Sequence, residues 1–200
     1  MQTRQIELDV CNLTSDFIES MIHLYLYERN VYPRASFSDF VAFGLHLKIC
    51  DNPDVKKYIS NCVESLRPQF SDINELRVVI KSISACSFES KPIESIVLHF
   101  DKLNEEFIKQ DICLSLLQEY FATILIQLKM LDSILQPFEF ETTWEPWVQF
   151  CSPPNQNENP TMSWRLVSNN TTDFVGSGSI YPIKSFHTDD IQMQVFLLQY

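Results

Sequence analysis

The hydrophobic pattern predicts two long helices with mixed structure between them. From about residue 9 to residue 32, apolar side chains recur at helical spacing over a broad face, which indicates a central, mostly buried helix. Pro33 is expected to end this helix, because the residue before a proline disfavours helical backbone. A second long helix is expected over residues 104–135 on the same grounds.

The region between these helices contains strand signals and a shorter helix. Residues 45–50 alternate apolar and polar side chains, as a half-buried strand does. Residues 51–53 (Asp-Asn-Pro) then form a helix start, and this helix is expected to reach about Leu66. Residues 75–83 and 93–100 are expected to form two strands joined by a polar connection.

After Pro137 the pattern changes to short extended segments joined by loops. Strands are expected at residues 138–144, 162–167 and 191–200, with a further apolar segment at residues 180–182. The loops are residues 152–161, rich in proline and asparagine, and residues 169–179, which contain two glycines.

Composition excludes several classes of function. The chain has 200 residues, of which 45% are hydrophobic and 20% charged, as is typical of one globular domain. Its three glycines, Gly44, Gly176 and Gly178, cannot form a dinucleotide fingerprint or a phosphate loop, since each needs glycines at short fixed spacing. The net charge of −11, without a basic run, argues against direct binding of nucleic acid.

The cysteines lack the spacing of a metal or redox site. There are six, and the two nearest in sequence, Cys50 and Cys62, are twelve residues apart, so the chain has no CxxC motif. The N-terminal residues contain no apolar signal core, so we expect reduced, buried thiols. No apolar stretch is long enough to cross a membrane, and no metal or cofactor is expected.

Two small clusters could carry out enzymatic chemistry, and each has a simpler explanation. His187 lies close to Asp189 and Asp190, which would suit an acidic hydrolase, but such a segment is more often a turn or cap. Glu139 and Glu141 lie two apart on an expected strand, like a glycosidase pair, but a solvated strand face is commoner. We therefore expect no catalytic residue and no enzymatic activity.

Several aromatic side chains have both a binding and a packing explanation. Trp144, Trp147 and Trp164 all fall in the last third of the chain, and tryptophan is enriched at binding anchors. The alternative is that they cover the core beneath a loop. His23 lies among apolar neighbours, so we expect a core histidine bonded to the backbone and not a ligand.

The end of the first helix carries a resemblance to a known family. Residues 23–33 read HLYLYERNVYP and are similar to the HORMA-domain family, most closely to the branch of the DNA polymerase zeta accessory subunit. Residues 52–59 resemble the second helix of that branch, and two segments between residues 180 and 195 resemble its closing segment. The expected order of elements agrees with the family along nearly the whole chain, while residues 34–44 and 136–163 match poorly.

The resemblance implies a single HORMA domain over residues 1–200 with an α+β fold, in which long helices pack on a mostly antiparallel sheet. Residues 1–135 would form the core, and residues 136–200 a mobile safety belt that wraps over a short extended peptide of a partner. The implied function is a non-catalytic adaptor subunit of translesion DNA polymerase zeta in DNA damage tolerance. It would be nuclear, with the cytoplasm as a second compartment, and would reach DNA only through partners and not bind membranes.

The resemblance also implies two binding surfaces. Tyr58 on the second helix and Trp164 in the belt would clasp a proline-containing peptide of the catalytic subunit. Ile180, Gln194 and Phe196 would bind the C-terminal domain of the deoxycytidyl-transferase scaffold polymerase, where the family more often has Leu, Gln and Tyr. The missing hydroxyl at Phe196 removes a hydrogen bond from this second surface.

Two further questions stay open at this point. HORMA proteins can self-associate near the middle of the long helix, where this branch has an arginine and this chain has Ala122, so self-association is undecided. The alternative function is another HORMA adaptor, such as a spindle-checkpoint or meiotic protein, with the same fold and a different partner.

Overall fold

The computed structural model describes residues 2–83, 90–103, 111–151, 164–166, 178–187 and 191–200. The helices are α1 (Gln2–Glu28), α2 (Pro53–Leu66), α4 (Asp111–Leu128) and α5 (Leu131–Ile134), with 3-10 turns at Arg34–Ser36 and Arg67–Asp72. The strands are β1 (Phe37–Ala42), β2 (Leu45–Cys50), β3 (Ile73–Ser82), β4 (Lys91–Leu103), β5 (Thr142–Phe150), β6 (Arg165–Leu166), β7 (Ser179–His187) and β8 (Ile191–Gln199).

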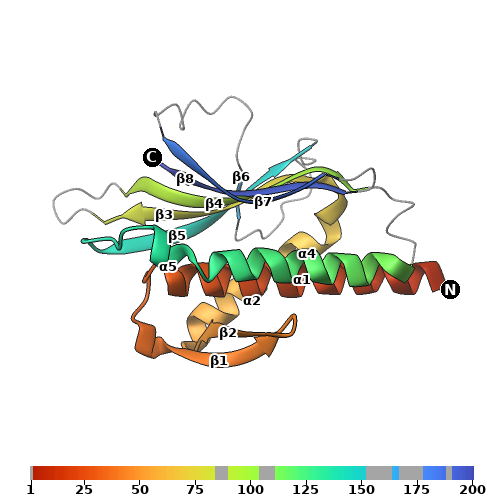
Figure 1. The fold of residues 1–200 in the computed structure, drawn as a ribbon, viewed down its shortest axis with the longest axis horizontal. Coiled ribbons are helices and arrows are strands. Elements are labelled where there is room, and N and C mark those ends of the chain that lie inside the picture. The colour runs from red at the N-terminus through yellow and green to blue at the C-terminus, as the bar shows by residue number, and fades with distance from the viewer. Residues whose placement is uncertain (1, 84–89, 104–110, 152–163, 167–177, 188–190) are drawn as a thin grey trace.

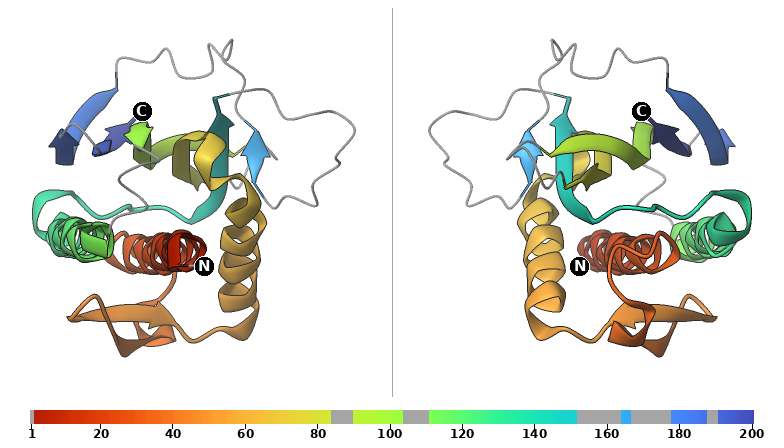
Figure 2. Two further views of the ribbon diagram at one scale, coloured as in Figure 1. Left: turned by 90° about the vertical axis from the view of Figure 1, so that its right-hand side faces the viewer. Right: turned by 90° about the vertical axis from the view of Figure 1, so that its left-hand side faces the viewer.

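These elements form three layers (Figure 1, Figure 2). A six-stranded sheet in the order β6-β5-β3-β4-β8-β7 lies on one side of α1 and α4, which lie side by side, and the β1–β2 hairpin lies on the other side. Neighbouring strands of the sheet are antiparallel, except that β6 runs parallel to β5. This arrangement confirms the predicted α+β fold of long helices on a mostly antiparallel sheet.

The core lies between the helix layer and the inner face of the sheet. Phe17 of α1 stacks on Phe121 of α4 with ring centroids 4.0 Å apart. On β3, Leu76, Val78 and Ile80 are almost fully buried in the same core, as the two-residue period of a strand requires. Each such side chain contributes about 1.5–3 kcal/mol by leaving water, so this interface is the main source of stability.

The first long helix ends earlier than predicted. It ends at Glu28, and Asn30 adopts a left-handed conformation with φ of 52°. The Val31 N–H then bonds the Leu26 carbonyl at 3.0 Å, so an asparagine in the left-handed region closes this helix. The prediction that Pro33 ends the helix was therefore wrong, because the backbone has turned before it is reached.

The sequence pattern also did not reveal strand β1. It pairs with β2 through a two-residue turn, with Ala42 opposite Leu45. Phe43 and Gly44 form the turn with φ values of 54° and 69°, as a type I′ turn requires. Strand β2 itself has the predicted bounds.

The second helix, α2, has the predicted start and end. The Asn52 side chain accepts hydrogen bonds from the N–H groups of Asp54 and Val55, at 2.9 and 3.4 Å, and Pro53 occupies the first turn. Its inward face consists of Ile59, Cys62, Val63 and Leu66, which are all buried. This buried face packs α2 against the core beside α1.

Later elements depart from prediction in two places. The second long helix is divided, because α4 ends at Leu128 and α5 begins at Leu131; residues 104–110 lie outside the described part. Strand β5 begins at Thr142 and not at residue 138. Glu139 and Glu141 are exposed and precede the strand, so the expectation that they share a strand face was wrong.

The C-terminal hairpin lies on the opposite side of the sheet from β5 and from β6, the strand that precedes it in sequence. Strand β5 pairs with β3, whereas β7 and β8 extend the sheet beyond β4 at the opposite edge. At about 4.8 Å between neighbouring strands, β5 and β7 lie about 19 Å apart. The chain from residue 151 to residue 178 therefore connects opposite edges of one sheet.

The described cysteines are free thiols in different environments. Cys50 and Cys62 are buried, as predicted, Cys11 is half-buried, and Cys151 is exposed, contrary to the expectation of buried thiols. The other two cysteines lie outside the residues whose side chains are described. Among the described helices, none is both long and apolar enough to cross a membrane.

Candidate functional site

Part of the outer edge of β5 has no neighbouring strand among the described residues. On its inner side β5 pairs with β3 from Thr142 to Phe150. On its outer side, within the described residues, it pairs only with β6, through Trp147 with Arg165 and Val148 with Leu166. Among the described residues, no strand therefore pairs with residues 142–146 on this side, and an extended peptide can add to such an open edge by hydrogen bonding.

Two aromatic rings from separate elements lie beside this edge. Tyr58 of α2 contacts Trp144 of β5 edge-on, with ring centroids 5.4 Å apart, and the Trp144 Nε1–H donates to the Tyr32 hydroxyl at 3.0 Å. Tyr58 is 39% exposed, whereas Trp144 is nearly buried. Burial, and secondly the neighbouring Cys62, raise the pKa of the Tyr58 hydroxyl, which therefore stays a neutral phenol. The pair forms an apolar wall with a polar tip, which is suited to a proline ring.

Trp164 lies against the same helix as Tyr58, but its ring is buried. Its Nε1–H donates to the carbonyl of Cys62 at 2.7 Å, one helical turn beyond Tyr58. The side chain is only 5% exposed and belongs to the core. The fold thus brings both predicted residues to α2, with Trp164 acting as the anchor that fixes the start of β6. Their contact with a peptide stays a prediction.

A charged cluster attaches β6 to the end of the open edge. The Glu145 carboxylate accepts from Lys81 and from the Trp147 Nε1–H, and it pairs with Arg165 at 3.4 Å. The Arg165 guanidinium also lies over the Trp147 ring, 4.8 Å from its centroid. Burial alone would raise the pKa of Glu145, but these hydrogen bonds and positive charges lower it overall. The carboxylate is therefore charged at neutral pH and holds β6 in place.

Two residues of the HLYLYERNVYP segment connect α1 to the middle of the sheet. Arg29 makes two hydrogen bonds to the Glu94 carboxylate, at 2.7 and 2.9 Å, and the Tyr25 hydroxyl donates to the same group at 3.0 Å. Gln199 of β8 adds a further bond to Glu94, also at 3.0 Å. One buried carboxylate thus joins α1, β4 and the C-terminal hairpin. This cluster is not predicted from the sequence, since no local signal identifies Glu94 as buried.

The three residues predicted for a second partner lie together on the C-terminal hairpin. Ile180 is opposite Leu198 and Phe196 is opposite Pro182, while Leu197 between them faces the helices and is fully buried. By strand alternation Ile180, Gln194 and Phe196 project from the outer face. Ile180 is 64% exposed. The fold therefore groups these residues on one surface, and their partner stays a prediction.

The remaining sequence candidates do not belong to the β5 edge. His23 is fully buried and its Nδ1 accepts from the Cys50 N–H at 3.4 Å, which confirms the predicted core histidine. His187 is exposed at the end of β7, and Asp189 and Asp190 lie outside the described residues. No group of three metal-ligating side chains occurs in the described part of the chain. Ala122 is half-buried on α4.

Known proteins resemble the chain in both sequence and fold. No family model matches it. It is 32% identical over 96 residues to mitotic spindle assembly checkpoint protein MAD2B of Dictyostelium discoideum, covering 47% of this chain and 27% of that protein. With MAD2B of Danio rerio it is 19% identical over 193 residues, covering 94% and 90%. With the checkpoint protein MAD2A of Mus musculus it is 31% identical over 75 residues, covering 36% and 37%.

Solved structures cover almost the whole fold. A chain in the crystal structure of the mitotic checkpoint complex superposes with a TM-score of 0.74 at 19% identity, covering 96% of this chain and 98% of that one. C. elegans HTP-2 bound to HTP-3 closure motif 1 superposes with a TM-score of 0.66 at 12% identity, covering 95% and 85%. The fold is that of HORMA domains. Most of the sequence relatives are proteins named MAD2B, and the chain spans less than two thirds of the length of several of them.

Proposed function

We propose that this chain is a non-catalytic adaptor that binds a proline-containing peptide of the catalytic subunit of DNA polymerase zeta. The observation that carries the proposal is the open edge of β5, combined with the docking of the C-terminal hairpin at the opposite edge of the sheet. HTP-2, which has a similar fold, is described as bound to a closure motif, and this supports peptide binding here.

The peptide would add to β5 as a further strand. Main-chain hydrogen bonds to residues 142–146 would supply affinity, and side-chain contacts would supply specificity. A proline ring would pack on Tyr58 beside Trp144, because both rings offer apolar faces. The safety belt expected over residues 136–200 would enclose the peptide, and its residue Trp164 is held at α2; residues 152–163 and 167–177 of this belt lie outside the described part. Such enclosure would slow dissociation more than association.

The adaptor would bridge two partners in the nucleus. The outer surface of β7 and β8, with Ile180, Gln194 and Phe196, would bind the C-terminal domain of the scaffold deoxycytidyl-transferase polymerase. With a net charge of −11, the chain would reach DNA only through these partners.

The test is a calorimetric titration of the chain with a proline-containing peptide of the catalytic subunit. Tyr58→Ala is expected to weaken binding by about tenfold or more, since a buried aromatic contact is worth about 1–2 kcal/mol. Ile180→Ala is the matched control, because Ile180 is exposed at the opposite edge, and it should leave this affinity unchanged. Equal affinities for Tyr58→Ala and the original chain, with equal thermal melting, would refute the proposed peptide site.

A second candidate is a spindle-checkpoint or meiotic adaptor, with the same edge and a different peptide. The similarity to MAD2A of Mus musculus and to the fold of HTP-2 favours it. Affinity capture followed by mass spectrometry distinguishes the two. Recovery of a polymerase catalytic subunit supports the first function, and recovery of a checkpoint activator or meiotic axis protein supports the second.

A further inference from the structure

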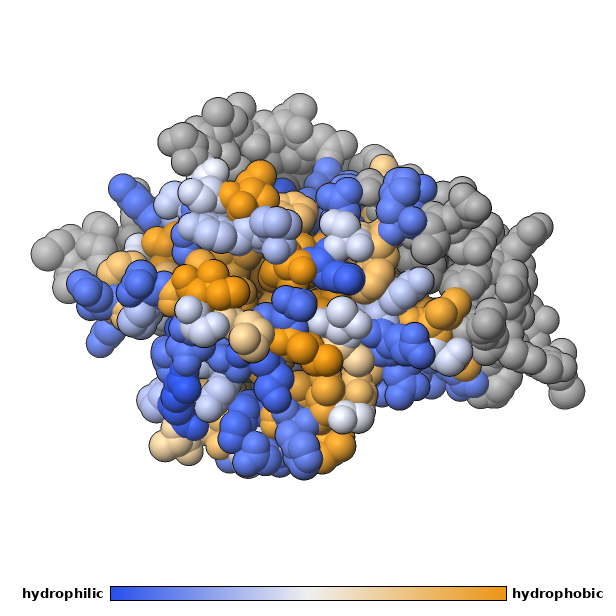
Figure 3. All heavy atoms as spheres, viewed as in Figure 1, coloured by the Kyte–Doolittle hydropathy of each residue, from blue (hydrophilic) through white to orange (hydrophobic). Residues whose placement is uncertain are grey.

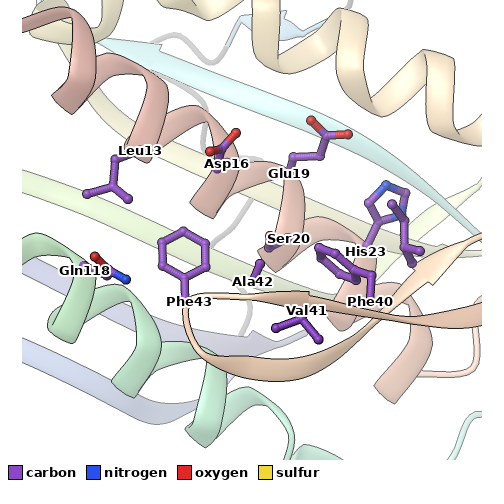
Figure 4. Close-up of a pocket in the computed structure, with 11 residues that line it drawn as sticks. Leu13, Asp16, Glu19, Ser20, His23, Phe40, Val41, Ala42, Phe43 and Gln118 are labelled. Carbon is purple, nitrogen blue, oxygen red and sulfur yellow. The ribbon is translucent and has the colours of Figure 1, made fainter.

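A cavity of about 430 Å³ lies between α1 and the turn of the β1–β2 hairpin (Figure 4). The β1–β2 hairpin lies on the side of the helix layer away from the large sheet (Figure 2), so a cavity lined by this hairpin is separate from the β5 edge. Its apolar lining includes Leu13 of α1 with Phe40 and Phe43 of the hairpin, and Val41 at its border is 66% exposed. Hydrophobic and hydrophilic residues are intermixed on the face of the molecule seen in Figure 3, and the cavity lining is likewise partly polar.

The polar part of the lining is acidic. Asp16 and Glu19 lie on one face of α1, three residues apart. Burial raises the pKa of Asp16, against the opposing effect of Arg67. Burial raises the pKa of Glu19 as well, and the negative charges of Asp16 and Glu64 add to this effect. Arg67 is already paired with Glu64 at 2.9 Å. A further cation brought into the cavity would relieve the repulsion that Asp16 and Glu64 exert on Glu19.

A buried histidine on the cavity border has an unused hydrogen-bond donor. Burial, and secondly the nearby charge of Lys56, lower the pKa of His23 to about 4, so its ring is neutral at pH 7. Its Nδ1 accepts from the Cys50 N–H, so the proton is on Nε2. Nε2 has no hydrogen-bond partner within the described residues, although the side chain is fully buried. A ligand carbonyl would satisfy this donor, which is otherwise costly to bury.

We propose that this cavity binds a basic, partly apolar peptide segment of a second protein partner. An arginine or lysine head group would lie between Asp16 and Glu19, a neighbouring apolar side chain would pack on Phe40 and Phe43, and a peptide carbonyl would accept from His23. The acidic net charge favours a basic partner at long range as well. Because the cavity and the β5 edge lie on different sides of the helix layer, both can be occupied together.

The test uses a capped probe peptide, acetyl-Leu-Arg-Leu-Arg-Leu-amide, titrated into the isotope-labelled full chain and followed by amide chemical shifts. Shifts are expected at Leu13, Asp16 and Phe43 and not on β5. Asp16→Asn with Glu19→Gln should weaken binding by about tenfold, as expected for two partly buried ion pairs. This variant should fold, because burial already disfavours both charges. The matched control is Glu139→Gln with Glu141→Gln, which removes two exposed charges and should leave the affinity unchanged.

Three results would overturn the proposal. The first is equal binding by the double variant and its control, and the second is equal binding of a probe with glutamine in place of arginine. The third is displacement of the probe by spermidine with the same shift pattern, which would assign the cavity to small cations. Because the polymerase-derived peptide is titrated separately, failure here leaves the proposed function intact.

Discussion

The buried ion pair between Arg29 and Glu94 offers a sharp test of how this fold is held together. Both side chains are almost fully buried, at 2% and 0% exposure, and the Nε of Arg29 lies 2.7 Å from the Glu94 carboxylate. Removing one partner leaves the other charge buried without its main counterion, which typically costs about 3–5 kcal/mol. For a chain of this length the melting temperature should fall by about 6–20 °C.

The prediction becomes specific in a double-mutant cycle. Arg29→Met and Glu94→Leu are each expected to be strongly destabilising, because each leaves a lone charge in the core. The double variant should lose no more stability than the worse single variant, since it contains no unpaired charge. Tyr25 and Gln199 lose their acceptor when Glu94 is replaced, so some loss remains.

The measurement is urea unfolding followed by far-ultraviolet circular dichroism, with all four proteins at one concentration. Strict additivity of the two single losses, within about 0.5 kcal/mol, would refute the reasoning. It would mean that the two side chains are solvated separately and that their contact contributes nothing to folding.

Three further predictions concern pH and backbone geometry. His23 takes up a proton only below about pH 4 in the folded state but near 6.5 when unfolded, so acidification through this window should reduce stability by up to about 3 kcal/mol. His23→Asn, which keeps an acceptor for the Cys50 N–H, should flatten this dependence in chemical unfolding at several pH values. Burial, with the charge of Asp132, raises the pKa of Glu28 to about 7, so stability should fall as pH rises from 4.5 through 7. Glu28→Gln should therefore raise the urea midpoint at pH 8 and leave it nearly unchanged at pH 4; a larger gain at pH 4 would contradict this. A Cβ at Gly178 would lie 2.3 Å from the Gln199 carbonyl oxygen, so Gly178→Ala should reduce hydrogen-exchange protection of β8, and unchanged protection would show that the hairpin can shift freely.

Local sequence signals were sufficient to predict the ends of those helices and strands whose ends are set by residues close by in the sequence. The start of α2 follows from Asn52 and Pro53, because the cap and the first turn are formed by residues within three positions of each other. The alternation of β2 similarly predicts its bounds. By contrast, the end of α1 depends on the left-handed conformation of Asn30. In the sequence, Pro33 is the stronger signal for a helix end, and it predicts the wrong position.

The candidate site was only partly visible in the sequence. The resemblance identified Tyr58 and Trp164, and both lie at α2 beside β5. It did not show that the indole of Trp164 would be buried, nor that Trp144 would stand next to Tyr58. Glu94 gave no signal at all, because its importance comes from donors that lie 65 or more positions away in sequence.

The sequence by itself determined the class of fold, the order of most elements and the absence of glycine-based phosphate sites. These properties depend on periodicity, composition and short motifs, which act over a few residues. Only the tertiary structure decided the order of the strands in the sheet and where the C-terminal hairpin docks. Strand order depends on hydrogen bonds between segments far apart in the chain, and alternation patterns are the same for a strand at either edge.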